Sequence, residues 1–261
     1  MEIVVCVKQV PDTTEVRIDP VKNTLIREGV PSIVNPFDKI AVEVAIQLKE
    51  KHGGRVRVVT MGPDMAKDAL KECLAIGADE AVLISDRAFA GADTLATSYA
   101  LAAAIGKMGP VDLILCGKQA IDGDTAQVGP GIAVRLGIPQ ITYAAKIELN
   151  GKMLKVDRES ETGFEIHETS MPVMITVGKS IAQPRYPTIK GTMKANRAQI
   201  PVWTAADIGA DARKIGLNGS PTQVRRIFVP QARAKGRIIR SETAAESVAR
   251  LMQKLSEAKI V

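Results

Sequence analysis

Val111-Asp112-Leu113-Ile114-Leu115-Cys116 runs directly into Gly117-Lys118-Gln119-Ala120-Ile121-Asp122-Gly123-Asp124-Thr125-Ala126-Gln127-Val128, and this stretch decides the fold. Its first part is short, apolar and bounded, which is typical of a buried parallel strand. Its second part is small, polar and twice interrupted by glycine, which predicts a loop at the carboxyl end of that strand. We expect a helix over residues 125–136 with Asp124 as its N-cap. Ligands of open α/β sheets bind beyond the strand ends, so this loop is the first candidate site.

The residue types in the loop suit a nucleotide. Gly117 and Gly123 let a ligand approach the backbone closely. The amides of residues 125–127, at the expected helix start, can face a phosphate. The side chains that can bind ribose or line the rim are Gln119, Asp122 and Gln127. The loop matches neither the P-loop nor the Rossmann fingerprint, so an ordinary strand-to-helix loop is the alternative interpretation.

Strand and helix patterns alternate on both sides of this stretch. Short apolar runs at residues 3–7, 55–61 and 80–84 predict strands, and helical spacing follows Asn35 and Asp93, each at an N-cap position. This order predicts an α/β fold with a doubly wound, mostly parallel, Rossmann-like sheet.

The pattern changes after Gln140. Asn150-Gly151 between two strand-like runs predicts a β-hairpin extension, and residues 164–168 and 173–177 predict further strands. A small hairpin is also expected over residues 16–26.

From Gln183 the chain is rich in Pro, Gly and Arg and carries few regular patterns until a final helix at residues 242–257. We therefore expect two parts: a nucleotide-binding domain over 1–183, and an extended C-terminal arm and helix over 184–261. An arm of this kind is expected to pack on another chain.

Composition limits the classes of protein that fit. The chain has 261 residues, of which 46% are hydrophobic, so a full core is available. Cys6, Cys73 and Cys116 form no C-x-x-C pair, which suggests a reducing compartment without a disulfide framework. The apolar run near the N-terminus is too short for a signal peptide, and no transmembrane segment is apparent. We expect a cytoplasmic protein.

Charge is unevenly distributed along the chain. From Arg185 onward there are 15 Lys or Arg and 5 Asp or Glu, whereas the preceding part has 20 and 24. The basic segment favours an anionic partner surface or a phosphate ligand. Nucleic acid is disfavoured, because the segment has few aromatic residues and no nucleic-acid-binding motif.

Catalytic side chains are scarce. Two scattered histidines offer no Ser-His-Asp or Cys-His arrangement and no metal cluster, so we assign no catalytic and no metal-binding residue. Asp122 and Asp124 could act as an acid–base pair, but a ribose ligand and a helix cap fit their positions better. A domain that holds a nucleotide and lacks reactive groups suits a redox carrier whose cofactor supplies the chemistry.

The loop at residues 117–128 closely resembles the nucleotide-binding loop of the small (beta) subunit of electron transfer flavoprotein. Further motifs extend the resemblance over nearly the whole chain, and they are Val7-Lys8-Gln9-Val10, Asn35-Pro36-Phe37-Asp38, Met61-Gly62-Pro63 and Pro184-Arg185-Tyr186. The resemblance implies a heterodimer with a larger, flavin-carrying (alpha) subunit. It also implies a nucleotide site in this chain, formed by Cys6, Asn35, Met61, Gly117, Lys118, Gln119, Ala120, Asp122, Gly123, Asp124, Thr125, Gln127 and Val128.

The occupant of that site divides the family. Ordinary members hold AMP there, whereas electron-bifurcating members hold a second FAD that accepts hydride from NADH. Residues 90–97 resemble the helix start that the bifurcating type places near the extra flavin. The resemblance therefore implies flavin contacts from Asp93, Thr94 and Thr97, with a simple helix cap as the alternative role of Asp93.

The resemblance also suggests how partners dock. The segment after the last strand is a docking loop for acyl-CoA dehydrogenases in this family, and Ile189 stands at its apolar tip, with Arg185 and Tyr186 before it. Glu159 matches an acidic residue that contacts the alpha subunit's mobile flavin domain. Ala182-Gln183 and residues 160–168, including His167, depart from the usual family pattern.

The sequence thus predicts the small subunit of a bifurcating electron transfer flavoprotein. NADH would reduce FAD in this chain. One electron would pass to the alpha subunit's FAD and on to an acyl-CoA dehydrogenase or enoyl-CoA reductase, and the other to ferredoxin or flavodoxin. Two alternatives stay open: a non-bifurcating carrier with AMP in the pocket, and a nucleotide-sensing scaffold.

Overall fold

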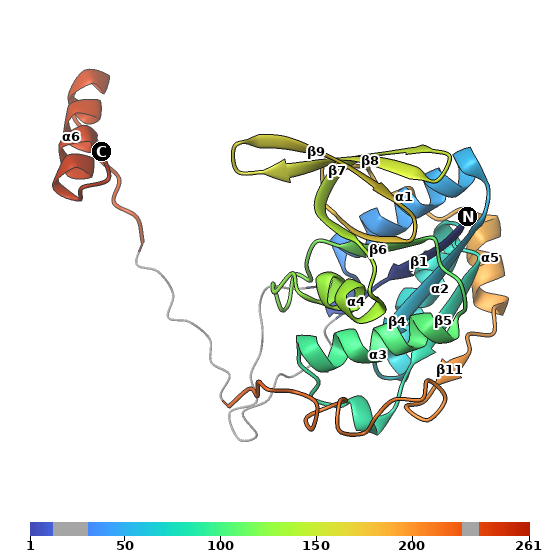
Figure 1. Ribbon diagram of the computed structural model, residues 1–261. Helices are drawn as coiled ribbons and strands as arrows, with labels where there is room; N and C mark the ends of the chain where they lie inside the picture. The colour runs from blue at the N-terminus through green and yellow to red at the C-terminus, as the bar shows by residue number, and fades with distance from the viewer. Residues whose placement is uncertain (13–30, 226–234) are drawn as a thin grey trace. The chain divides into compact units, whose positions relative to one another are not determined.

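A computed structural model describes residues 1–12, 31–225 and 235–261, so the small hairpin expected over residues 16–26 lies outside the described residues. The chain divides into two compact units, Met1–Arg226 and Ile227–Val261. Figure 1 shows the helices and strands of both units.

The first unit is built on a nine-stranded sheet with the order β11-β5-β4-β1-β6-β10-β7-β8-β9. Its parallel part consists of β1 (Glu2–Cys6), β4 (Arg55–Met61), β5 (Glu80–Ile84), β6 (Leu113–Gly117), β10 (Val173–Val177), β11 (Val202–Trp203) and the start of β7 (Gln140–Asn150). β8 (Met153–Ser160) and β9 (Gly163–Ser170) continue from β7 as an antiparallel ribbon. A separate two-stranded sheet pairs β2 (Gln9–Pro11) with β3 (Ser32–Val34). The predicted α/β class and the hairpin extension are confirmed.

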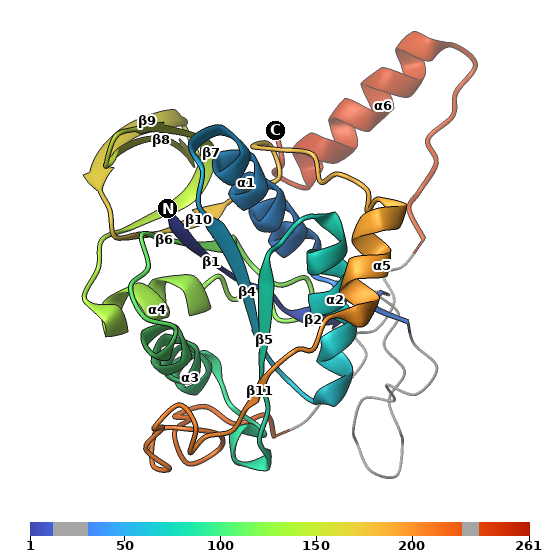
Figure 2. The same cartoon turned by 90° about the vertical axis from the view of Figure 1, so that its right-hand side faces the viewer.

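Helices cover both faces of the sheet (Figure 2). α1 (Pro36–His52), α2 (Lys67–Ile76) and α5 (Ile189–Arg197) lie on one face, and α3 (Thr94–Lys107) and α4 (Val128–Leu136) lie on the other. Two short 3₁₀ turns, η1 (Asp64–Ala66) and η2 (Arg87–Phe89), precede α2 and α3.

Strand β1 shows why its sequence is apolar without alternation. Ile3 and Val5 lie in the core beneath α1 and α2, whereas Val4 and Cys6 lie in the core beneath α3 and α4. A strand that is buried on both faces needs apolar side chains at successive positions, and the sequence of β1 has them.

The segment after residue 183 is more regular than expected. Pro201 and Trp203 accept hydrogen bonds from the amides of Leu83 and Ser85, so β11 extends the sheet beside β5. Helix α5 packs on α2, where Gly191 meets the carbonyl of Ala75 so closely that no side chain would fit. Residues up to Arg226 therefore belong to the first unit, which runs well past the boundary expected at residue 183.

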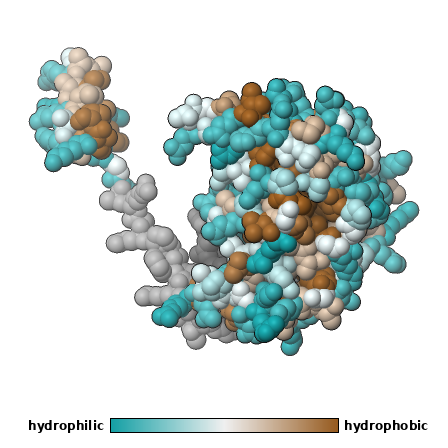
Figure 3. All heavy atoms as spheres, viewed as in Figure 1, coloured by the Kyte–Doolittle hydropathy of each residue, from teal (hydrophilic) through white to brown (hydrophobic). Residues whose placement is uncertain are grey.

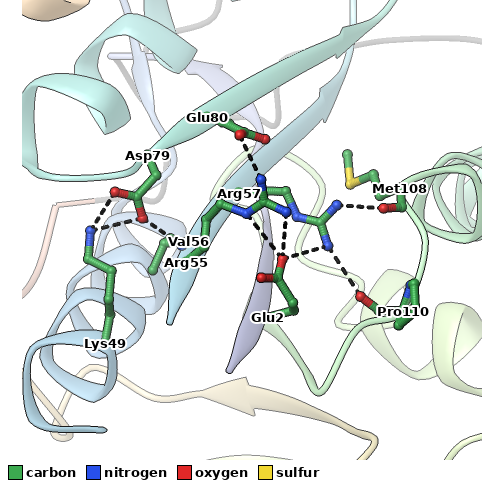
Figure 4. Close-up of polar contacts among 9 residues, drawn as sticks. All are labelled: Glu2, Lys49, Arg55, Val56, Arg57, Asp79, Glu80, Met108 and Pro110. Carbon is green, nitrogen blue, oxygen red and sulfur yellow. Dashed lines mark hydrogen bonds and ion pairs between the residues drawn. The ribbon is translucent and has the colours of Figure 1, made fainter. Parts of the chain in front are cut away.

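A charged network closes the amino-terminal edge of the sheet (Figure 4). Arg57 is 5% exposed and donates to the carbonyl of Met108 over 2.7 Å, while the carboxylate of Glu2 lies 3.3 Å from its guanidinium. Arg55 bridges Glu2 and Glu80. A buried guanidinium is costly without such partners, so these contacts tie β1, β4 and β5 together at the end opposite the candidate loop.

The second unit contains α6 (Ala244–Glu257), which Thr243 caps by accepting a hydrogen bond from the amide of Glu246. The helix expected at residues 242–257 is thus present two residues shorter. Val248, Leu251 and Met252 lie on one side of α6, and each is about half exposed (Figure 3). No residue of the helix is buried in this chain.

Candidate functional site

The candidate site lies where the strand order reverses. β1 has β4 on one side and β6 on the other, so the loops leaving β1 and β6 separate at their carboxyl ends. Cys6 and Cys116 are in register on these two strands. Crevices at such switch points are the usual ligand sites of open α/β sheets.

Asp38, in the first turn of α1, joins the two strand ends. One carboxylate oxygen accepts the amide of Lys8 over 2.8 Å and the other accepts the amide of Gly117 over 3.1 Å. A Cβ at residue 117 would lie 2.7 Å from the backbone of Phe37 and closer still to the Asp38 carboxylate. Gly117 is therefore needed for helix α1 to approach the strand. A Cβ at residue 123 would have only Lys8 Nζ near it, at 4.0 Å. Gly123 therefore leaves open space beside the backbone.

We predict a pH dependence of stability from Asp38. Burial raises the pKa of its carboxyl from 3.8 to about 7, although the amides of Lys8 and Gly117 act in the opposite direction. A group whose pKa is higher in the folded chain stabilises the fold at low pH and loses that contribution as pH rises through about 7. The free energy of unfolding should therefore fall between pH 5 and 7, by at most about 1.4 kcal/mol per pH unit. Urea titrations at pH 5, 6, 7 and 8 should show this slope in the wild type and not in Asp38→Asn. An equal slope in both would contradict the assignment.

Asn35 fixes the path of the loop. Its side chain is fully buried, donates from Nδ2 to the carbonyl of Gln119 over 2.8 Å, and accepts the amide of Ile121 at Oδ1 over 3.2 Å. Asn35 does precede α1 as predicted, but its side chain does not cap that helix. It holds the loop from a distant part of the chain.

Asp122 is paired with a residue that follows β1, across the switch point of the sheet. Both of its carboxylate oxygens accept from Lys8 Nζ, over 2.6 and 2.8 Å. The ammonium and carboxylate are 49% and 33% exposed, so the pair contributes little to stability and can rearrange for a ligand. Lys8, like Asp38, is absent from our sequence-based list of site residues, although it follows β1 directly and lies within one of the recognised motifs.

Helix α4 begins later than expected. Its first residue is Val128, its N-cap is Gln127, and Asp124 does not cap it. Asp124 and Ala126 instead have φ of 52° and 54°, a left-handed conformation that costs non-glycine residues about 1–3 kcal/mol and often occurs at ligand sites. The Asp124 side chain accepts a hydrogen bond from Gln119. The amides of residues 125–127 have no acceptor in the part of the chain that the structure describes.

Asp93 caps α3 and anchors a distant segment. One carboxylate oxygen accepts the amides of Leu95 and Ala96, and the other accepts the amide and hydroxyl of Thr222 over 3.1 and 2.9 Å. Burial raises the pKa of Asp93, but these hydrogen bonds outweigh it and the net pKa is low. The structure gives Asp93 the role of a cap, the alternative stated above. Thr94 Oγ1 donates to Gln127 Oε1 over 2.8 Å, so the start of α3 does meet the candidate loop.

The remaining site residues surround this centre less directly. Met61 ends β4, and Thr97 lies one turn into α3 without a side-chain hydrogen bond to the loop. Lys118 extends toward the rings of Phe37 and Tyr143, and the carbonyl of Ala120 accepts the amide of Asp124. A hydrogen bond with Cys6 and burial both raise the pKa of the Cys116 thiol, which disfavours the nucleophilic thiolate at this residue.

The expected docking residues differ in their exposure. Arg185 directs its guanidinium inward, where it binds Glu43 and Glu50. Tyr186 and Ile189 are 92% and 84% exposed, but Ile189 opens helix α5 and is not at a loop tip. Glu159 is exposed on β8, near Gly178 at the end of β10.

Two kinds of site are not found among the described residues. No group of three or more His, Cys, Asp or Glu side chains could hold a metal ion there. None of the described helices is both long and apolar enough to cross a membrane.

Comparisons with known proteins agree with the motifs. The model of the electron transfer flavoprotein domain matches residues 22–208. The chain is 54% identical to an electron transfer flavoprotein subunit beta of Megasphaera elsdenii, with all of both chains covered. It is 52% identical to one of Clostridium acetobutylicum, with 98% of each chain covered. It is 51% identical to the caffeyl-CoA reductase-Etf complex subunit CarD of Acetobacterium woodii, again with full coverage.

Proposed function

Because the chain belongs to the electron transfer flavoprotein family and matches its beta subunits along its length, we propose that it is the small subunit of an electron-bifurcating member. In this proposal the crevice between β1 and β6 binds FAD, which accepts hydride from NADH. One electron passes to FAD in an alpha subunit and on to an acyl-CoA dehydrogenase or enoyl-CoA reductase. The other passes to ferredoxin or flavodoxin.

The residues of the crevice fit an adenine-containing cofactor. The amides of residues 125–127, which have no acceptor among the described residues, can donate to a diphosphate, and left-handed residues such as Asp124 and Ala126 are typical of anion-binding backbone turns. Asp122 can exchange Lys8 for ribose hydroxyls, and Lys8 is then available to a phosphate. The bound flavin would supply the redox chemistry, and this chain would bind and orient it.

The observation that carries the proposal is the row of loop amides, without acceptors among the described residues, close to Thr94. A nucleotide bound by the loop would have the start of α3 next to it, because Thr94 contacts Gln127. The Thr94 hydroxyl can therefore contact a group larger than AMP, and we assign the same role to Thr97, one turn further along α3. The similarity to a subunit of a reductase complex further supports the bifurcating type.

A non-bifurcating carrier with AMP in the crevice is the second candidate, because the loop amides and Asp122 would serve AMP equally well. The released nucleotides separate the two. The chain should be purified with its alpha subunit and denatured, and the nucleotides quantified. Two FAD per heterodimer support bifurcation, one FAD with one AMP supports the ordinary carrier, and absence of flavin refutes both. Family membership disfavours the scaffold alternative.

Asp122→Ala is predicted to weaken nucleotide retention about 10- to 100-fold, because a hydrogen bond to a charged group contributes about 1.5–3 kcal/mol. The unfolding midpoint in urea should hardly change, since the exposed pair with Lys8 contributes little. Glu161→Ala, at the exposed β8–β9 turn, is the matched control. Unchanged nucleotide occupancy in Asp122→Ala would contradict the site.

Partner contacts are proposed for three surfaces. The apolar side of α6, with Val248, Leu251 and Met252, fits an alpha subunit, because a half-exposed apolar stripe is stabilised by burial. Tyr186 and Ile189 are proposed to contact the dehydrogenase or reductase, and Glu159 the alpha subunit's flavin domain. We keep the cytoplasm as the proposed compartment, because Cys6, Cys73 and Cys116 are all free thiols.

A further inference from the structure

A second polar site lies apart from the crevice, at the far end of α4. It is a cavity of about 490 Å³ between the first turn of α3, Arg135 of α4, and the segment 213–221. Arg135 is seven residues beyond Val128, which is about 10 Å along the helix. Three basic side chains, Arg135, Arg213 and Lys214, line the cavity, and no carboxylate does.

Arg135 is held in place from two sides. Its Nε donates to Ser98 Oγ over 3.2 Å and its Nη2 to the carbonyl of Leu95 over 3.0 Å. Its guanidinium also lies 5.3 Å from the centre of the Tyr99 ring. These contacts leave Nη1 without an acceptor among the described residues.

Lys214 is oriented by the Tyr99 ring, and Arg213 by Asp211, whose amide is bound to Tyr99. Lys214 Nζ lies 5.6 Å from the centre of the Tyr99 ring, and the Tyr99 hydroxyl accepts the amide of Asp211 over 3.0 Å. Arg213 binds the Asp211 carboxylate through Nε and Nη2 over 3.1 and 2.9 Å. Its Nη1 and the Lys214 ammonium have no acceptor in the described part of the chain.

The segment that carries Arg213 and Lys214 is fixed to the body of the protein. The amide of Asp93 donates to Ser220 Oγ over 2.8 Å, and Ser220 Oγ donates to the carbonyl of Gly216 over 2.6 Å. Ser220 is only 9% exposed. The backbone of this segment is therefore anchored to the body of the protein, while the Arg213 side chain is 89% exposed.

Asp211 neutralises one of the three cations, Arg213, and the other two repel each other unless an anion joins them. Neither Arg135 nor Lys214 has a carboxylate within ion-pair distance among the described residues. Guanidinium and ammonium groups with free donors are the usual partners of phosphate oxygens. The cavity is within the size range of small-molecule sites and larger than one phosphate requires. Leu95 and Pro221 add apolar wall beside the cations.

We propose that this cavity binds the pyrophosphate group of a nucleoside diphosphate or dinucleotide, through Arg135, Arg213 and Lys214. The site is separate from the crevice and does not depend on which nucleotide the crevice holds.

Calorimetric titration of the chain with its partner subunit tests the proposal, with inorganic pyrophosphate as the probe at low ionic strength. Arg213→Gln/Lys214→Gln should raise Kd at least about tenfold, because two charged donors are lost. Arg135 is left intact, since it also joins α3 to α4. The control Lys152→Gln/Lys155→Gln removes the same charge from the exposed β7–β8 hairpin and should leave Kd unchanged.

The other outcomes decide against the site. Equal weakening in both double variants would mean general charge attraction, and loss of binding in Lys8→Met would mean that pyrophosphate occupies the crevice. Orthophosphate binding as tightly as pyrophosphate would refute the proposed ligand class, and no pyrophosphate binding in the wild type would refute the site. NADH and ADP as further probes should both compete with pyrophosphate. Failure here would leave Asp122→Ala and the released nucleotides as independent tests of the crevice.

Discussion

Replacing Arg185 with methionine is expected to lower the free energy of unfolding by about 2–4 kcal/mol, because it leaves a buried carboxylate without its partner. Glu43 lies on α1 with its side chain 4% exposed, and Arg185 donates to it over 2.8 and 3.0 Å. A second carboxylate, Glu50, binds the same guanidinium over 2.6 Å. The Arg185 side chain is itself 35% exposed, which keeps the expected loss below that of a fully buried pair. Thermal unfolding should show a decrease in Tm of about 5–15 °C.

The pH dependence of this variant gives a second readout. Burial by itself raises the pKa of Glu43. The hydrogen bonds from Arg185 lower this pKa by more than burial raises it, so the net pKa is below 4.5. Stability from a carboxylate of lowered pKa is present above its unfolded value and is lost as pH falls through its folded value. The deficit of Arg185→Met should therefore shrink as pH falls below 4.5.

Tyr186→Ala is the matched control, because Tyr186 is the next residue and is 92% exposed. It should leave Tm unchanged and, if our docking proposal holds, should weaken the contact with a dehydrogenase partner. A stable Arg185→Met protein that loses only partner binding would show that Arg185 belongs to the docking surface after all.

Replacing Gly117 with alanine is expected to cost about 3–5 kcal/mol and to release the nucleotide. The new Cβ would lie 2.7 Å from the backbone of Phe37, so helix α1 and strand β6 would have to separate. The hydrogen bond from the Gly117 amide to Asp38 would then be lost at a buried carboxylate. Urea unfolding and the nucleotide content of the purified protein measure the two effects.

Gly123→Ala distinguishes an effect on ligand binding from an effect on stability within the same loop. Space around Gly123 is open, so alanine there should not change the free energy of unfolding. If a ligand approaches the backbone at this residue, nucleotide retention should fall nonetheless. Equal destabilisation by both alanine substitutions would contradict the different roles that we assign to Gly117 and Gly123.

The order of strands and helices could be predicted because it follows local patterns. Apolar runs such as Ile3–Val5 are buried on both faces, and an Asn-Gly turn joins β7 to β8. Helix α5 escaped detection because only Ala195 of its residues is buried, and it packs through Gly191 instead of an apolar stripe. Its nine residues are also too few to give a sustained apolar repeat.

The position of the candidate loop in the fold could be predicted, whereas the contacts that its residues make could not. The loop after β6 and the residues after β1 do meet, as parallel strands require. The helix start was placed three residues early, because nothing in the sequence marks Asp124 and Ala126 as left-handed. The roles of Asn35, Lys8 and Asp38 depend on contacts across 30 residues or more, which local patterns do not encode.

The late position of β11 in the chain has a consequence for synthesis. Until the ribosome has made Trp203, the outer side of β5 is a row of backbone donors and acceptors with no neighbour. Open strand edges of this kind recruit other chains. A nascent or truncated polypeptide ending at Gln183 should therefore self-associate. The strand that covers the edge of β5 is made only after the candidate loop has been followed by more than seventy further residues.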